Sequence, residues 1–297
     1  IGMLTTLQAD NSRRKKMDST REFFAHHQWK DVLGTSSVIR RVVAEGKTLA
    51  EMEDPVALIG ENGTGKSFFA QCIHNGSPRA KKPYIVINAG TIAQQDAARV
   101  LFGSDDGAKP RMGLFELAGG GTIALQGLGD ASEAFFSCLR QVLLQHSYFA
   151  VGGVTTIPFS ARLLALVTPE ERRRIPRDLW DQLSVFSLNL PLLKDRQEDV
   201  STLFRFFLLR ESILMPPRTQ KELEEILSFY SWPANLISLS AVSKRYILLY
   251  QQAMNPSPSA KQQILIRAIG EDELLSDIYR QYPALTDAAN SPPEEVL

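Results

Sequence analysis

The sequence has few cysteines, no excess of charge and no long apolar run. Its only cysteines, Cys72 and Cys138, are too few for a disulfide framework and lack the clustering of a metal site, so both are expected to be buried thiols. The 33 basic residues balance the 33 acidic ones, which excludes a bulk attraction to nucleic acid or anionic membrane. No apolar run reaches the roughly 18 residues of a spanning helix and no signal-peptide pattern opens the chain, so a cytoplasmic protein without membrane partners is expected.

Strand and helix patterns alternate in the first two thirds of the chain and then give way to helices alone. Short apolar runs separated by amphipathic stretches predict an α/β domain over residues 32–192, with a doubly wound, mainly parallel sheet covered on both faces. After Pro191 the strand pattern stops, and amphipathic stretches predict a small α-helical lid domain over 193–255.

The two ends of the chain lack the strand and helix patterns that predict these domains. Residues 1–31 are expected to be an N-terminal arm or linker, with a basic stretch over 11–16 and a short helix through Phe23, Phe24 and Trp29. Residues 256–297 are expected to be a linker, a helix from Ala260 to about Tyr279 that Gly270 interrupts, and a tail rich in Pro and Glu.

One segment carries a phosphate-binding pattern. Residues 60–67 fit G-x-x-x-x-G-K-[ST] at every fixed position, after an apolar strand pattern and before a helical one. Glycines let backbone N–H groups turn toward phosphates, Lys66 supplies a cation, the Ser67 hydroxyl can reach Mg²⁺, and the following helix adds its positive N-terminus. The pattern predicts a nucleotide site built from Gly60, Glu61, Asn62, Gly63, Thr64, Gly65, Lys66 and Ser67.

Several further segments stand in a fixed order along the chain. Together with the phosphate-binding segment 60–67, which we call the P-loop, they are Leu33–Ser36, Pro83–Asn88, Leu101–Gly103, Gly113–Ala118, Asp178–Leu183, Arg196–Val200 and Trp232–Asn235. With them, the stretch from Leu33 to about Leu248 resembles the central AAA+ domain of bacterial sigma-54-dependent transcription activators. The resemblance implies a P-loop AAA+ fold, ATP or ADP with Mg²⁺ as ligands, self-association as a dimer or ring, action on RNA polymerase carrying sigma-54, and DNA binding through flanking modules.

The sequence departs from this family where hydrolysis is carried out. Family members have an Asp-Glu pair after the strand that matches Thr122–Leu125, and here Gln126 and Gly127 follow it. In the family the Asp helps to hold Mg²⁺ and the Glu orients the attacking water. Since phosphoryl transfer to water depends on such positioning, the loss predicts hydrolysis slowed by orders of magnitude.

The sensor and arginine-finger positions also differ. Thr168 stands at the usual asparagine of the first sensor, and Ile237 at the lid arginine of the second. Pro176 and Gln182 stand where the family has its two finger arginines; Arg177 or the run Arg172–Arg174 is the alternative, through a shift in register. The residues that would assist the reaction in a neighbouring copy are therefore expected to be degenerate.

The family's Gly-Ala-Phe-Thr-Gly-Ala loop, which engages sigma-54, should follow Leu101–Gly103. The segment Ser104–Gly113 keeps only Gly107 and Ala108 of it. The shortened loop predicts a domain that does not drive open-complex formation through sigma-54.

Together these patterns indicate a nucleotide-binding, hydrolysis-deficient module of a bacterial transcription regulator, in which the nucleotide stabilises one oligomeric state. Two alternatives remain open. One is a weakly active ATPase that uses Glu61, Asp105 or Asp130 as a displaced carboxylate, and the other is an interaction scaffold that binds no nucleotide. No helix-turn-helix pattern follows the lid, so DNA contact is expected from segments outside or flanking this chain.

Overall fold

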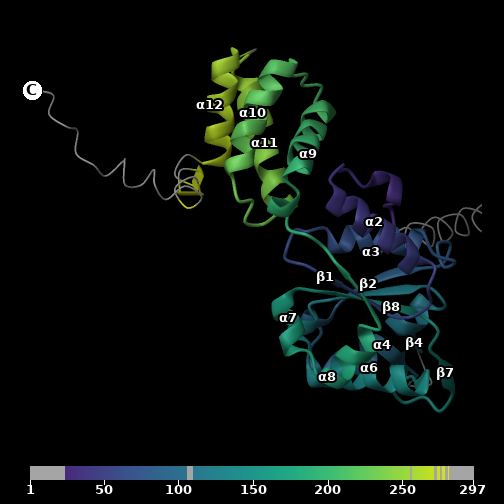
Figure 1. Ribbon diagram of the computed structural model, residues 1–297. Coiled ribbons are helices and arrows are strands. Elements are labelled where there is room, and N and C mark those ends of the chain that lie inside the picture. Colours follow the sequence, from purple (N-terminus) through teal and green to yellow (C-terminus); the bar gives the residue numbers. More distant parts are fainter. Residues whose placement is uncertain are drawn as a thin grey trace, which may run out of the picture. The chain divides into compact units, whose positions relative to one another are not determined.

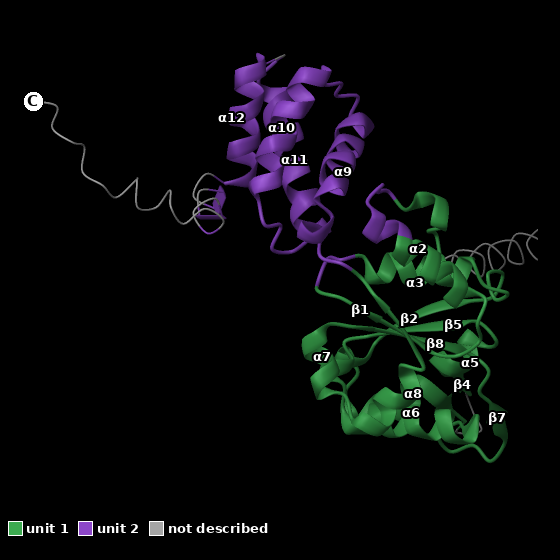
Figure 2. Ribbon diagram, viewed as in Figure 1, with its two compact units in different colours: residues 1–32, 41–61, 65–190 green, residues 33–40, 62–64, 191–297 purple. Residues whose placement is uncertain are grey.

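The computed structural model describes residues 24–105, 110–254 and 256–270, together with residues 273, 274, 276, 277 and 280. The basic stretch over 11–16, Phe23, Gly107, Ala108 and Tyr279 therefore lie outside the described residues. Among the helices that are described, none combines the length and the apolar character needed to cross a bilayer. Figure 2 colours two compact units: residues 41–61 and 65–190 fall in the first with the described part of 1–32, and residues 33–40, 62–64 and those from 191 onward fall in the second.

A five-stranded sheet forms the centre of the first unit. Its strand order is β2-β5-β8-β1-β9, and every neighbouring pair is parallel. The strands are β1 (Val56–Ile59), β2 (Tyr84–Asn88), β5 (Thr122–Gln126), β8 (Arg162–Val167) and β9 (Phe186–Asn189). The predicted doubly wound, mainly parallel sheet is thereby confirmed.

Helices cover both faces of this sheet. Figure 1 shows α3 (Lys66–Asn75) on one face and α6 (Glu133–Gln145) and α8 (Arg177–Leu183) on the other. Every residue of β8 is buried, because a central strand with helices on both faces has no solvent-facing side, which is why it reads as a continuous apolar run after Arg162. Cys72 and Cys138 are free and buried, as predicted.

Apart from the 14-residue α2, the remaining elements up to the end of the sheet are short. They are η1 (Trp29–Asp31), α2 (Ser37–Ala50), η2 (Ala89–Thr91), η3 (Gln94–Asp96), α4 (Ala97–Phe102), β3 (Gly103–Ser104), β4 (Arg111–Met112), α5 (Leu114–Ala118), η4 (Leu128–Asp130), β6 (Ser147–Phe149), β7 (Thr156–Pro158) and α7 (Pro169–Arg174). The helix predicted through Phe24 and Trp29 is wrong. Phe24 lies in a bend and a single 3₁₀ turn forms at η1, where the Gln28 N–H donates to the Asp31 carboxylate at 2.8 Å.

The second unit is helical in its described C-terminal part. A short turn η5 (Leu193–Arg196) leads into α9 (Gln197–Arg210), α10 (Pro217–Phe229), α11 (Leu236–Gln252) and α12 (Pro258–Ile269). Their buried faces share one apolar core that includes Phe204, Leu223, Trp232, Tyr246 and Leu265.

The end of α12 falls at the glycine that the sequence predicts as an interruption of this helix. The helix ends at Ile269, because Gly270 adopts φ +113°, a backbone conformation that glycine enters easily and other residues rarely do. Residues 273, 274, 276, 277 and 280 are helical again, so the predicted interruption at Gly270 is confirmed.

Asp199 ties the start of the second unit to α9. Its carboxylate is fully buried and accepts hydrogen bonds from the Thr35 N–H at 2.6 Å, the Ser36 N–H at 2.9 Å and the Ser36 hydroxyl at 2.7 Å. Gly34 is required beside it, since a Cβ there would lie 2.9 Å from the Asp199 carboxylate and φ is +144°. A buried carboxylate is tolerated only where donors satisfy it, so this contact fixes the segment before α2.

Candidate functional site

The phosphate-binding pattern forms a loop between β1 and α3. The Gly60 N–H donates to the Val167 carbonyl at 3.1 Å, which extends the β1–β8 pairing by one residue. Gly65, at φ +108°, then starts α3, so the first N–H groups of that helix face the end of the loop. Glycine is needed here because the turn from strand to helix uses a left-handed backbone conformation.

Lys66 folds back over the start of the loop. Its Nζ donates to the Gly60 carbonyl at 2.6 Å and to the Glu61 carbonyl at 3.1 Å. Burial lowers the pKa of Lys66, whereas the carboxylates of Glu171 and Glu61 raise it. The ammonium is thus held by neutral backbone carbonyls, and an anionic phosphate oxygen is a stronger acceptor for the same donors.

The loop tip, Asn62–Thr64, groups with the second unit. The Asn235 Nδ2 donates to the Asn62 carbonyl at 2.9 Å, and the Leu236 N–H donates to the Gly63 carbonyl at 3.1 Å. Gly63 has φ +78°, and a Cβ there would lie 2.1 Å from the Ala234 carbonyl oxygen. Glycine at this position is therefore dictated by a neighbouring backbone.

Asn235 is a residue that the sequence pattern named without assigning it a role. Its side-chain oxygen accepts from the Leu193 N–H at 2.8 Å while its nitrogen holds Asn62, and its backbone has φ +53°. Asparagine tolerates that conformation better than most residues. The signal available in the sequence was the motif Trp232–Asn235, but its contacts to residues 193 and 62 are too distant along the chain to be read from it.

Gln126 lies at the carboxyl end of β5 and meets the P-loop. Its Nε2 donates to the Ser67 Oγ at 3.0 Å. Gly127, the next residue, has φ +63°, and a Cβ there would lie 2.5 Å from the Asn88 Oδ1. The structure therefore brings the Gln126 amide to Ser67, a contact that the sequence did not predict, and gives residue 127 a backbone that suits glycine.

Thr168 follows β8 and caps α7. Its hydroxyl accepts from the Glu171 N–H at 3.1 Å, and the Glu171 carboxylate accepts from the Thr168 N–H at 2.7 Å. This reciprocal arrangement is a capping box, which satisfies two donors at the helix start. Both side chains are thus used to begin a helix.

The positions expected to be degenerate fingers are engaged within their own segment. Pro176 precedes α8, and the Gln182 amide donates to the Asp178 carbonyl at 3.2 Å. Of the arginine alternatives, Arg172 stacks over the Trp180 ring at 5.1 Å and Arg174 pairs with Asp130 at 2.6 Å.

Arg177 is solvent-exposed at the start of α8, and Ile237, which the resemblance predicts to stand at the second sensor position, is 59% exposed on α11. An exposed isoleucine supplies an apolar side chain where the family has a charged one.

The carboxylates considered as displaced catalysts have other surroundings. Asp130 is ion-paired with Arg174, and Glu61 acts electrostatically on Lys66. Asp105 follows β3, and its N–H donates to the Val151 carbonyl at 2.9 Å. Among the described residues, no group of three or more His, Cys, Asp and Glu side chains could hold a metal ion. At Ser67 the neighbouring side chain is the Gln126 amide, whereas Mg²⁺ favours carboxylate oxygens, so this pair fits a phosphate better than Mg²⁺.

The segment after α4 is a short hairpin. Gly103 and Ser104 of β3 pair antiparallel with Met112 and Arg111 of β4, and Ser104 bridges to Val151. Gly107 and Ala108, the residues kept from the family loop, lie outside the described residues.

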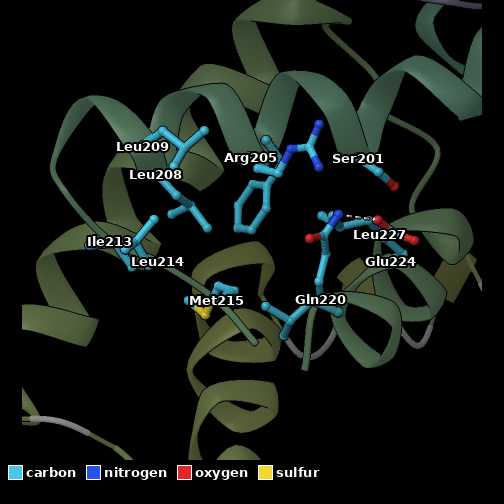
Figure 3. A pocket seen from close by; sticks show the side chains of 12 residues that line it. Ser201, Arg205, Leu208, Leu209, Ile213, Leu214, Met215, Gln220, Glu224 and Leu227 are labelled. Carbon is cyan, nitrogen blue, oxygen red and sulfur yellow. Dashed lines mark hydrogen bonds between the residues drawn. The ribbon is translucent and has the colours of Figure 1, made fainter. Parts of the chain in front are cut away.

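A separate pocket of about 290 Å³ lies within the second unit (Figure 3). Its walls come from α9, α10 and the segment between them, and most of them are apolar, including Leu208, Ile213 and Leu227. Arg205 lines the pocket, and the Gln220 amide donates to Glu224 at 3.0 Å. The polar lining residues include Ser201 and Glu224, and the P-loop remains the candidate site because it alone matches a phosphate-binding pattern.

Comparison with known proteins adds to this geometry. The family described as "Sigma-54 interaction domain" matches residues 32–189. The chain is similar to the Nif-specific regulatory protein of Sinorhizobium fredii, with 34% identity over 238 residues that cover 75% of this chain and 39% of that protein. It is also similar to the DNA-binding transcriptional activator HyfR of Escherichia coli, with 31% identity over 260 residues that cover 82% of this chain and 39% of that protein. The chain thus spans about two fifths of the length of these relatives.

Solved structures share the fold. The crystal structure of NtrX from Brucella abortus in complex with ATP matches with a TM-score of 0.70 and 23% identity, covering 91% of this chain and 60% of that chain. The ADP complex of the same protein matches with a TM-score of 0.68 and 23% identity, covering 97% of this chain and 70% of that chain. At this identity the match establishes a common architecture.

Proposed function

The chain belongs to the family of sigma-54 interaction domains, and from that premise we propose that it binds an adenine nucleotide through its P-loop without hydrolysing it. The observation that carries the proposal is the environment of Ser67. Lys66 and the start of α3 provide positive charge for phosphates, while the Gln126 amide occupies the place of the acid that would help to hold the metal. The ATP and ADP complexes of NtrX, a structure with the same fold, support the choice of nucleotide.

Loss of hydrolysis follows from several substitutions together. Gln126 and Gly127 supply no carboxylate, Thr168 and Glu171 are joined in a capping box, and Pro176 and Gln182 supply no guanidinium. Removing one water-positioning or charge-stabilising group typically costs a reaction about 10²–10³ in rate. Because several such groups are absent here, we expect the rate of ATP hydrolysis to be lower than that of a weakly active ATPase.

We place this module in a bacterial transcription regulator. HyfR is a DNA-binding activator by its name, and the curated relatives are longer than this chain, which supports DNA contact through flanking segments. The short β3–β4 hairpin supports a role that does not use the family's loop on sigma-54 polymerase. A bound nucleotide then acts as a ligand that favours one state of self-association, as a dimer or ring, over another.

The test is the mass of the protein in solution at fixed concentration, measured without nucleotide, with ADP and with ATP. We expect either nucleotide to shift the apparent self-association constant at least about tenfold, or roughly 1.4 kcal/mol. Lys66→Ala is the matched control and should show no shift. Equal masses with and without saturating nucleotide would contradict the assembly role, and absence of binding would favour the scaffold alternative.

A further inference from the structure

The metal side of the P-loop is altered more deeply than its phosphate side. In P-loop proteins the hydroxyl that follows the lysine and a nearby carboxylate together hold Mg²⁺. Here the Ser67 Oγ already accepts a hydrogen bond from the Gln126 Nε2 at 3.0 Å. The amide directs its donating nitrogen at Ser67, and although its oxygen can accept, the neutral group gives a cation no charge to bind against, so this pair favours an anion over a metal ion.

No neighbouring acid replaces the missing carboxylate among the described residues. The Glu171 carboxylate accepts from the Thr168 N–H at 2.7 Å as part of a helix cap, and Asp130 is paired with Arg174 at 2.6 Å. Residue 127 is a glycine, and a Cβ there would lie 2.5 Å from the Asn88 Oδ1, so an acidic side chain would clash with Asn88. Each of these three positions is therefore engaged in another contact or blocked by a neighbouring side chain.

From these contacts we infer that the P-loop takes its nucleotide as the free anion, without a divalent cation. The inference rests on the proposed nucleotide binding and deepens it. The phosphate charge is offset by Lys66 and by the N-terminus of α3, both of which are present without metal. The occupancy of such a site depends on the nucleotide concentration and does not depend on the Mg²⁺ concentration.

The experiment is a titration of the full chain with ADP, followed calorimetrically, once in excess Mg²⁺ and once in excess EDTA. The dissociation constants are expected to agree within about twofold. In Gln126→Asp the carboxylate would repel the phosphates when no metal is present and hold Mg²⁺ when it is, so EDTA is expected to weaken binding at least about tenfold. Gln126→Asn, which shortens the amide without adding charge, is the matched control and should keep the wild-type indifference.

Wild-type binding that weakens tenfold or more in EDTA would overturn this inference and leave the proposed function standing. If the wild type showed no saturable ADP binding in either buffer, or bound ADP no more tightly than Lys66→Ala does, both this inference and the proposed function would be overturned. If Gln126→Asp does not fold, as judged by its circular dichroism, the wild-type comparison decides alone, because it needs no variant.

Discussion

Replacing Lys66 with alanine is expected to weaken nucleotide binding by about a hundredfold, or roughly 2.7 kcal/mol, in a titration with a fluorescent ATP analogue. The ammonium is the charged group that lies over the loop, with its Nζ 2.6 Å from the Gly60 carbonyl oxygen. In the bound state those donors would pass to phosphate oxygens, and charge-assisted hydrogen bonds are about twice as strong as neutral ones. Alanine removes both the charge and the donors.

Lys47→Ala is the matched control, since Lys47 is an exposed lysine in the last turn of α2. It should bind the analogue as the wild type does. Equal affinities for Lys66→Ala and the wild type would mean that the loop does not hold the phosphates. The thermal unfolding temperature of both variants, measured without nucleotide, separates loss of binding from loss of folding.

Asp199→Asn is expected to lower the free energy of unfolding by about 2–4 kcal/mol, measured by urea denaturation. The carboxylate accepts three hydrogen bonds from Thr35 and Ser36 and is fully buried. An asparagine keeps one acceptor oxygen, but its NH₂ group replaces the second one. That group is a donor, so it cannot accept a hydrogen bond from Thr35 or Ser36. At least one buried polar group is then left without a partner.

Glu198→Gln provides the control for this prediction. Glu198 is the preceding residue of α9 and is exposed, so its replacement should change stability by less than about 0.5 kcal/mol. If Asp199→Asn proved as stable as Glu198→Gln, the Asp199 contacts would contribute nothing to folding. Hydrogen exchange at the Thr35 and Ser36 amides should rise in Asp199→Asn, because both amides donate to the replaced carboxylate.

The sheet and most helices could be predicted because their signals are local. The buried run of β8 and the glycine spacing of the P-loop are properties of consecutive residues, and both give their element without knowledge of the rest of the chain. Local prediction failed at η1, where Phe24 and Trp29 suggested a helical face but only one turn forms.

The contacts that define the site could not be predicted, since they join distant residues through side-chain geometry. Gln126 was identified as a substituted position, yet its hydrogen bond to Ser67 depends on how β5 and α3 are placed. Asn235 holds Asn62 across 173 positions of sequence, and nothing local to either residue indicates the partner. The engagement of Thr168 in a cap, in contrast, was readable as Thr-x-x-Glu before a helix.

The central claim is that the loop holds a nucleotide and does not turn it over. The direct measurement is phosphate release under single-turnover conditions, with protein in excess over ATP and occupancy determined in the same sample. The account predicts saturable occupancy that Lys66→Ala abolishes, and phosphate release no faster than with that variant. Release that depends on Lys66 and approaches about 1 s⁻¹, at the low end of common enzyme rates, would contradict it.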